Sequence, residues 1–176
     1  MSEIWVSAAV AAAVTLVIEY VAKPTLEARK DRILHAWRNV RHLRASVQHL
    51  YRSVIYLSSE PIWQSSRNLV EAELDKCDEL NERITDLTVE AIAKVPEGLP
   101  ERLISCTGFV KGATLRVRQG LDGEEPTAHH VERFRQIEPI VEACVKYFDV
   151  PHRRIFARAR ALRAIDDARE AFAQAD

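Results

Sequence analysis

Three histidines recur at an interval of seven residues, which raises the question of metal binding. His35, His42 and His49 lie in a segment that reads HAWRNVR, HLRASVQ, HLYRSVI. Ligands on one helix converge on a metal ion when they are three or four residues apart, whereas seven residues separate them by roughly 10.5 Å. The spacing therefore predicts three histidines on a solvent-exposed face of a helix, and we expect no metal site.

Two Arg–His pairs in the same region resemble the Arg-x₄₋₆-His spacing of HEPN-type ribonucleases, which are also all-α. The pairs are Arg44 with His49 and Arg29 with His35, and the resemblance covers these two residue types alone. It implies, as an alternative, a soluble helical nucleic-acid-binding protein or an RNase. A nucleophile elbow, paired catalytic carboxylates, an HExxH motif and a phosphate loop are all missing from the sequence. We therefore predict a protein that is not an enzyme, with no catalytic, cofactor-binding or metal-binding residues.

A cluster of arginines near the C-terminus carries charge suited to phosphate, in RNA or in lipid headgroups. Its members are Arg153, Arg154, Arg158, Arg160 and Arg163. The same segment has an apolar stripe from Ile155 and Phe156 through Ile165 to Phe172, and it lacks the interleaved aromatic residues that stack on bases. The preferred interpretation is the polar side of a packed helix that faces the acidic segment 60–101. An anion or partner contact is the second interpretation, and nucleic acid is not an expected partner.

The N-terminal segment is almost free of charge. The nineteen residues from Ile4 to Ala22 contain one charged side chain, Glu19. As a helix they would be roughly 28 Å long, close to the thickness of a bilayer core. Six Lys or Arg follow within twenty residues and none precedes, which places the N-terminus outside and the rest in the cytoplasm. We predict a single-pass signal-anchor in the cell membrane, with a soluble core helix or a cleaved signal peptide as alternatives.

Four basic residues directly after this segment are expected to contact anionic lipid headgroups, at about 1 kcal/mol each near the surface. They are Lys23, Arg29, Lys30 and Arg32. The segment before them also contains several small residues, Ser and Ala at 7–13, spaced so that two anchors can pack closely. The expected partners are thus the lipid bilayer and another protein or a second copy of the chain.

The placement of glycine and proline predicts an all-α fold. All five glycines fall between Gly98 and Gly123, and the seven prolines are spread along the chain. Glycine-free stretches bounded by proline favour long helices. Three widely separated cysteines, Cys77, Cys106 and Cys144, indicate buried thiols in a reducing compartment and not a disulfide framework.

Two heptad seams follow the apolar N-terminus. The first runs through Ile33, Trp37, Val40, Leu43, Val47, Leu50, Val54 and Leu57, and the second through Val70, Leu74, Cys77, Leu80, Ile84, Leu87 and Ala91. Residues 23–53 carry a balance of +6 and residues 60–101 a balance of −7. We expect a capped turn at Ser58 or Ser59 and a long antiparallel coiled-coil hairpin, with its basic arm against its acidic arm.

The remaining chain is predicted to form a connector with one helix and then a helical pair. The expected helices are 101–118, with Gly108 and Gly112 at close contacts, 127–148 and 151–173; an extended piece at 114–118 is an alternative to the first. The predicted organisation is a transmembrane anchor 1–23, a helical hairpin 24–95, a Gly/Pro-containing connector 96–126 and a C-terminal helical pair 127–176.

These elements suit a membrane-anchored cytoplasmic helical bundle that acts as a non-enzymatic interaction or scaffold module. A membrane-perturbing oligomeric effector, of a toxin or defence type, is a second hypothesis. The soluble nucleic-acid-binding or HEPN-like protein is the third.

Overall fold

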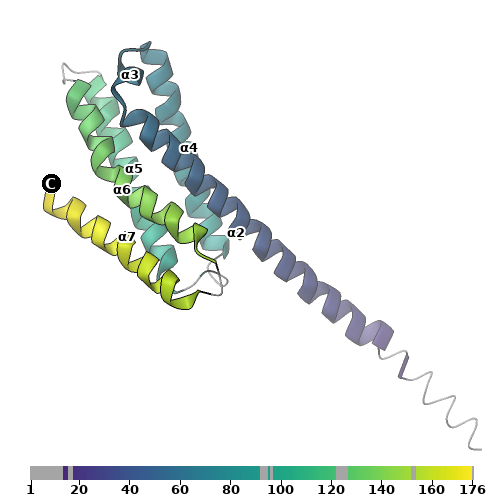
Figure 1. The fold of residues 1–176 in the computed structure, drawn as a ribbon. Coiled ribbons are helices and arrows are strands. Elements are labelled where there is room, and N and C mark those ends of the chain that lie inside the picture. Colours follow the sequence, from purple (N-terminus) through teal and green to yellow (C-terminus); the bar gives the residue numbers. More distant parts are fainter. Residues whose placement is uncertain are drawn as a thin grey trace, which may run out of the picture. The chain divides into compact units, whose positions relative to one another are not determined.

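The computed structural model describes residues 14–15, 18–91, 95, 97–121, 127–151 and 154–175. Over these ranges the chain is helical and contains no strand, which confirms the predicted all-α helical bundle (Figure 1). The elements are a π-helix η1 (Ile18–Ala22) and the helices α2 (Lys23–Leu57), α3 (Glu60–Trp63), α4 (Arg67–Ala91), α5 (Leu99–Leu121), α6 (Thr127–Asp149) and α7 (Ile155–Ala175).

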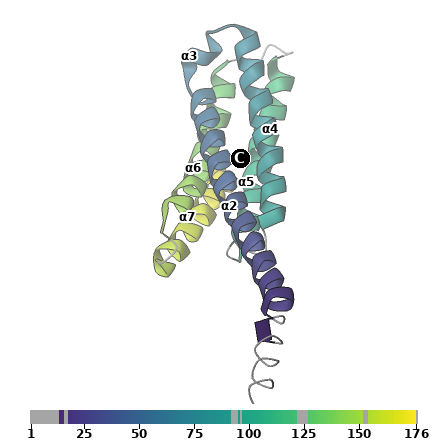
Figure 2. The ribbon, with the colours of Figure 1, turned by 90° about the vertical axis from the view of Figure 1, so that its right-hand side faces the viewer.

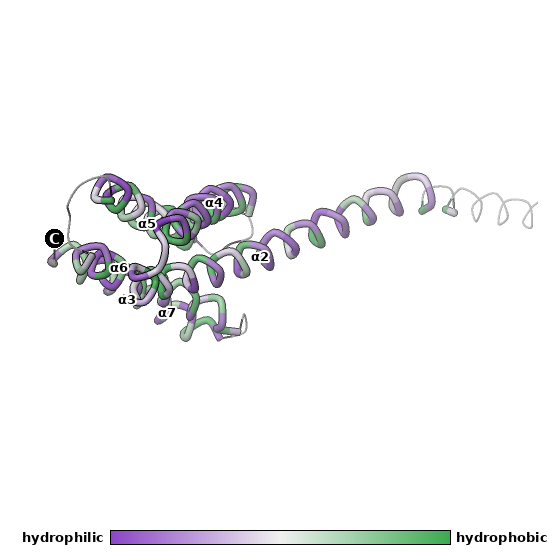
Figure 3. Tube along the Cα trace, turned by 90° about the horizontal axis from the view of Figure 1, so that it is seen from above, coloured by the Kyte–Doolittle hydropathy of each residue, from purple (hydrophilic) through white to green (hydrophobic). Residues whose placement is uncertain are grey.

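The chain divides within α2 into two units, residues 1–38 and residues 39–176. In the first unit the described apolar side chains are exposed to solvent, and they include Ile18, Tyr20, Leu26, Ile33 and Trp37. Hydrophobic and hydrophilic residues alternate along α2 (Figure 3), as the heptad pattern predicts.

The predicted transmembrane helix is not supported by the described residues. Within them, none of the helices is both long enough and apolar enough to cross a bilayer. Residues 1–13, 16 and 17 of the predicted anchor lie outside the part of the chain that the structure describes.

In the second unit, α5 packs against both α4 and α6, and α7 packs against α6 and α5 (Figures 1 and 2). The core is formed by apolar side chains of all the longer helices, including Leu50 of α2, Leu74 of α4, Val110 of α5 and Phe134 of α6, each at most 1 % exposed. Burial of this apolar surface is the main contribution to the stability of the bundle.

The second half of α2 runs antiparallel to α4, as the predicted hairpin requires. Asn39 donates a hydrogen bond to Glu90 near the end of α4, at 3.1 Å. At the other end the chain reverses through α3, where the Trp63 indole donates to the Leu57 carbonyl at 2.9 Å. Ser59 holds the N-cap position of α3, but its hydroxyl donates to the Tyr56 carbonyl. The predicted side-chain cap is therefore not formed.

The seam predicted for the second arm is wrong at two positions. Asn81 and Thr88 are buried, at 3 % and 0 % exposure, while Leu80 and Leu87 are only half-buried at the edge of the core. A strict alternation of three and four residues from Val70 passes through Asn81 and Thr88 and misses both leucines. Helix geometry, not side-chain polarity, decides which positions face inward here.

Two further expectations are corrected in the C-terminal half. The segment 114–118 is helical, within α5, so the extended alternative is excluded. The predicted apolar stripe of the last helix begins too early, because Ile155 and Phe156 are 75 % and 92 % exposed. The packed part of α7 begins further along, around Leu162 and the fully buried Ile165.

Candidate functional site

A groove of about 480 Å³ lies in the second unit, where α5, α6 and α7 meet. Its walls combine apolar, aromatic and charged side chains. The lining residues are Gly108, Phe109, Gly112, Ala113 and Arg116 of α5, His129, Glu132, Arg133, Gln136 and Ile137 of α6, and Phe172 of α7. On α5 and α6 these residues recur at helical spacing, so each helix contributes one face to the groove.

Two glycines form part of the α5 wall, and the expectation of close contacts around them is wrong. A Cβ atom added at Gly108 or Gly112 would meet nothing within 4 Å. Positive φ does not require them either, because Gly98 is the glycine with that conformation among the described residues. A glycine inside a helix costs about 1 kcal/mol relative to alanine. The two positions thus leave space above α5 at a cost in stability that the packing of the bundle does not explain.

The apolar part of the groove is built on two phenylalanine rings. Phe109 and Phe172 pack with their centroids 4.9 Å apart and their planes tilted by 58°. Below them, Ala113 and Ile137 are 5 % and 2 % exposed, so they join the groove to the hydrophobic core. This surface can hold an apolar ring or chain.

The charged part of the groove comes from α5 and α6. Arg116 stands one turn beyond Gly112 on the same face of α5, and Arg133 stands one turn beyond His129 on α6. Glu132 contributes the single carboxylate among the lining residues. Two guanidinium groups against one carboxylate leave the groove with a net positive charge, which favours anions.

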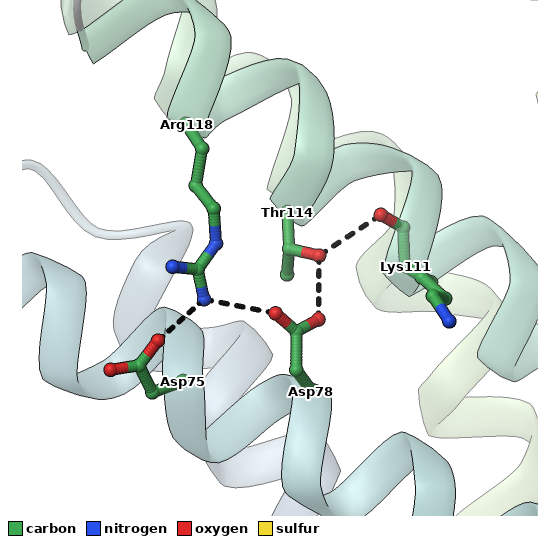
Figure 4. A network of polar contacts seen from close by, with 5 residues as sticks. All are labelled: Asp75, Asp78, Lys111, Thr114 and Arg118. Atoms are coloured by element: carbon green, nitrogen blue, oxygen red, sulfur yellow. Dashed lines mark hydrogen bonds and ion pairs between the residues drawn. The ribbon is translucent and has the colours of Figure 1, made fainter.

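A polar network holds the other side of α5 against α4 (Figure 4). Arg118 lies 2.7 Å from Asp75 and 2.9 Å from Asp78. The Thr114 hydroxyl lies 2.9 Å from both the Asp78 carboxylate and the Lys111 carbonyl, and it can donate to one of them at a time. Hydrogen bonding to Asp75 raises the pKa of Arg118 above its usual range. The acidic arm thus pairs here with α5, whereas the sequence predicts pairing with the basic arm.

A second ion pair fixes α7 to α5. Arg102 contacts the carboxylate of Asp166 with two nitrogens, at 2.9 Å and 2.5 Å, and it also donates to the Gly98 carbonyl at 2.6 Å. The hydrogen bond to Asp166 raises the pKa of Arg102. Because α7 carries Phe172, this pair helps to position one wall of the groove.

The predicted headgroup-binding residues lie together on the first turns of α2. Lys23, Arg29, Lys30 and Arg32 are all exposed. This surface belongs to the first unit, whereas the groove belongs to the second.

The predicted C-terminal arginine cluster is only partly available for a ligand. Arg158 lies 5.3 Å from the centre of the Tyr147 ring, so it contributes to the packing of α7 on α6. Arg154, Arg160 and Arg163 are exposed, and Arg153 lies outside the described residues. The predicted contact of this cluster with the acidic arm is replaced by packing of α7 on α6 and α5.

The histidine prediction is confirmed, since His35, His42 and His49 are all exposed on α2. Arg44, the partner of His49 in the HEPN-like pair, forms an ion pair of 2.7 Å with Asp149 at the end of α6. Over the part of the chain that the structure describes, no three His, Cys, Asp or Glu side chains are grouped to hold a metal ion.

The three cysteines are buried free thiols, as the sequence predicts. Burial raises the pKa of the Cys77 thiol to about 12. The pKa of Cys144 is also raised, because of a hydrogen bond with Cys106 and because of burial. Thiols held in this protonated state are poor nucleophiles.

Comparisons with protein-family models, with curated proteins and with solved structures find no match to this chain. Its function must therefore be argued from the residues themselves. Sequence reasoning missed the groove because its residues come from three helices. One signal was present, namely two mid-helix glycines followed by an arginine at a spacing of four, Gly108, Gly112 and Arg116.

Proposed function

We propose that the protein is a non-enzymatic interaction module, a helical bundle that is held at a membrane by its N-terminal apolar segment. In this proposal residues 4–22 enter the bilayer as a single-pass anchor. The basic residues that follow bind anionic headgroups, and the bundle on the cytoplasmic side binds a partner.

The observation that carries the proposal is the exposure of apolar side chains before residue 39. Ile18, Tyr20, Leu26 and Trp37 are 55 %, 75 %, 63 % and 55 % exposed. Monomeric soluble proteins rarely leave a long series of large apolar side chains in water, and such a series marks a membrane or protein interaction surface. The uncharged run that precedes it and the absence of basic residues before Ile4 favour the membrane as the partner of the N-terminal part.

The basic residues support the same orientation. Lys23, Arg29, Lys30 and Arg32 are exposed and lie within one helix that begins where the apolar run ends. Such a cluster is attracted to the anionic cytoplasmic leaflet. Beyond it, the second unit offers a groove with binding chemistry, aromatic rings beside guanidinium groups.

Fractionation of the full-length chain tests the anchor. We expect the protein in the membrane fraction, resistant to high salt and released by detergent. The double variant Ala11→Glu/Val14→Glu should move to the soluble fraction, because each buried carboxylate opposes insertion. The control Val89→Glu/Leu115→Glu places the same charges on exposed positions of the bundle, 58 % and 56 % exposed, and should stay with the membrane. A wild-type chain that is soluble without detergent would overturn the proposal.

A second assay separates scaffolding from the effector hypothesis. The full-length protein is reconstituted in liposomes loaded with a fluorescent dye. A scaffold anchored by single helices leaves the dye inside, whereas release that increases with the protein-to-lipid ratio would favour a membrane-perturbing assembly.

A further inference from the structure

We propose that the groove between α5, α6 and α7 is a binding site for a small organic monoanion with an apolar ring. The ring lies between the walls that carry Phe109 and Phe172, and the acidic group faces Arg116 and Arg133. This goes beyond the proposed function, which assigns no small-molecule ligand to the bundle.

The size of the groove fits such a ligand. A volume of about 480 Å³ falls in the range of small-molecule sites in proteins, roughly 300–1,000 Å³. The groove has an apolar floor and a few charged groups at one part of its wall, the usual arrangement in which burial supplies affinity and polar groups supply orientation.

The two glycines are the strongest argument that the space itself is useful. Gly108 and Gly112 have ordinary helical backbone, and neither faces a neighbour that a methyl group would disturb. Alanine at both positions would make a more stable helix with the same packing. The gain from glycine is the open volume beside Phe109, which larger side chains would fill.

The charges define the class of ligand. Arg116 and Arg133 reach the groove from two different helices, so one acidic group can be held from both sides. Their existing interactions within the protein orient the two side chains and do not remove their charge. Glu132 stands on the same wall as Arg133 and repels additional negative charge. This balance favours a monoanion over a polyphosphate or a nucleic-acid backbone.

The proposal is tested by calorimetric titration of the full-length chain, in detergent or in lipid nanodiscs where it requires them. The probe is naphthalene-2-sulfonate, the neutral comparison is naphthalene-2-methanol, and the blank is the same mixture without protein. We expect saturable binding of one sulfonate per chain and binding of the alcohol that is about tenfold weaker or undetectable.

Variants locate the site. Gly112→Leu fills the groove and should abolish detectable binding, and Arg116→Gln should raise the dissociation constant about tenfold. The controls Ala164→Leu on α7 and Arg83→Gln on α4 make the same changes at exposed positions outside the groove, and they should bind like the wild type.

Folding is monitored so that a lost site and a lost fold are distinguished. Circular dichroism melting should show Gly108→Ala/Gly112→Ala to be more stable than the wild type, yet weaker in binding the sulfonate. Three results would overturn the proposal: no binding to the wild type, equal binding by the folded Gly112→Leu variant, or equal affinity for the sulfonate and the neutral alcohol.

Discussion

The two halves of α2 carry one heptad pattern under opposite conditions. Between residues 43 and 57 the pattern is covered, and Leu43, Val47 and Leu50 are at most 2 % exposed. Before residue 39 the same spacing places Ile33 and Trp37 in solvent, at 43 % and 55 % exposure. Periodicity determines which side chains share a face of a helix, but another surface has to cover that face. The second unit supplies that surface for residues 43–57, and we propose that a membrane or a partner supplies it for the earlier ones.

The largest expected effect compares two positions of this one pattern. Leu50→Ala should lower the free energy of unfolding by about 2–5 kcal/mol, because it removes a fully buried side chain and leaves a cavity. Trp37→Ala should change it by less than about 0.5 kcal/mol, because the side chain is exposed. Urea denaturation followed by circular dichroism measures both. Equal losses at the two positions would show that the first half is covered within the protein and would break the comparison.

The next effect extends the contrast between open and covered positions into the bundle. Gly108→Ala/Gly112→Ala should raise the free energy of unfolding by about 1–2 kcal/mol in total, since both positions are helical and open. The control Gly98→Ala should lower it, because Gly98 has a φ of +84° and a Cβ there would lie 2.5 Å from the Arg102 guanidinium. Denaturant midpoints provide the measurement, and a destabilised double variant would contradict the open geometry of α5.

A smaller effect tests the covered seam of α4 itself. Thr88 is fully buried, and its hydroxyl has no hydrogen-bond partner among the described residues. Thr88→Val keeps the shape and removes the unsatisfied group, so it should raise the free energy of unfolding by about 1 kcal/mol. The matched control is Thr85→Val, which loses the hydrogen bond to the Asn81 carbonyl and should give no gain. A loss of stability in Thr88→Val would mean that the hydroxyl is satisfied.

The smallest effect concerns the ion pair between α2 and the end of α6. Arg44 and Asp149 are 48 % and 53 % exposed, and their atoms lie 2.7 Å apart. Arg44→Gln should lower the free energy of unfolding by less than about 0.5 kcal/mol, since exposed pairs are screened by water and salt. The difference from the wild type should disappear in 1 M NaCl. A large effect that persists in salt would show that α2 depends on charge for its coverage in this region.

Most helices were predictable from local chemistry. The predicted helix 127–148 compares with Thr127–Asp149, and the predicted helix 101–118 with Leu99–Leu121. Glycine and proline placement marks such boundaries because these residues alter the backbone itself. The burial of the three cysteines and the exposure of the three histidines were also predicted correctly, since both follow from spacing and residue type.

The errors have a common origin in packing. Leucines at 80 and 87 predict the inner face of α4 better by polarity than Asn81 and Thr88 do, yet the helix turns the polar pair inward. Ile155 and Phe156 look like core residues but remain exposed at the start of α7. In each case the neighbouring helices, and not the residue type, decided burial.

The sequence by itself determined that this protein is helical, where its longer helices lie, and that its basic and acidic residues are segregated along the chain, because backbone preference and periodicity act over a few residues. Only the tertiary structure decided which heptad is covered, that the acidic arm pairs with Arg118, and that two glycines open a groove beside Phe109 and Arg116. Those features depend on residues far apart in the chain, and packing alone brings them within reach of one another.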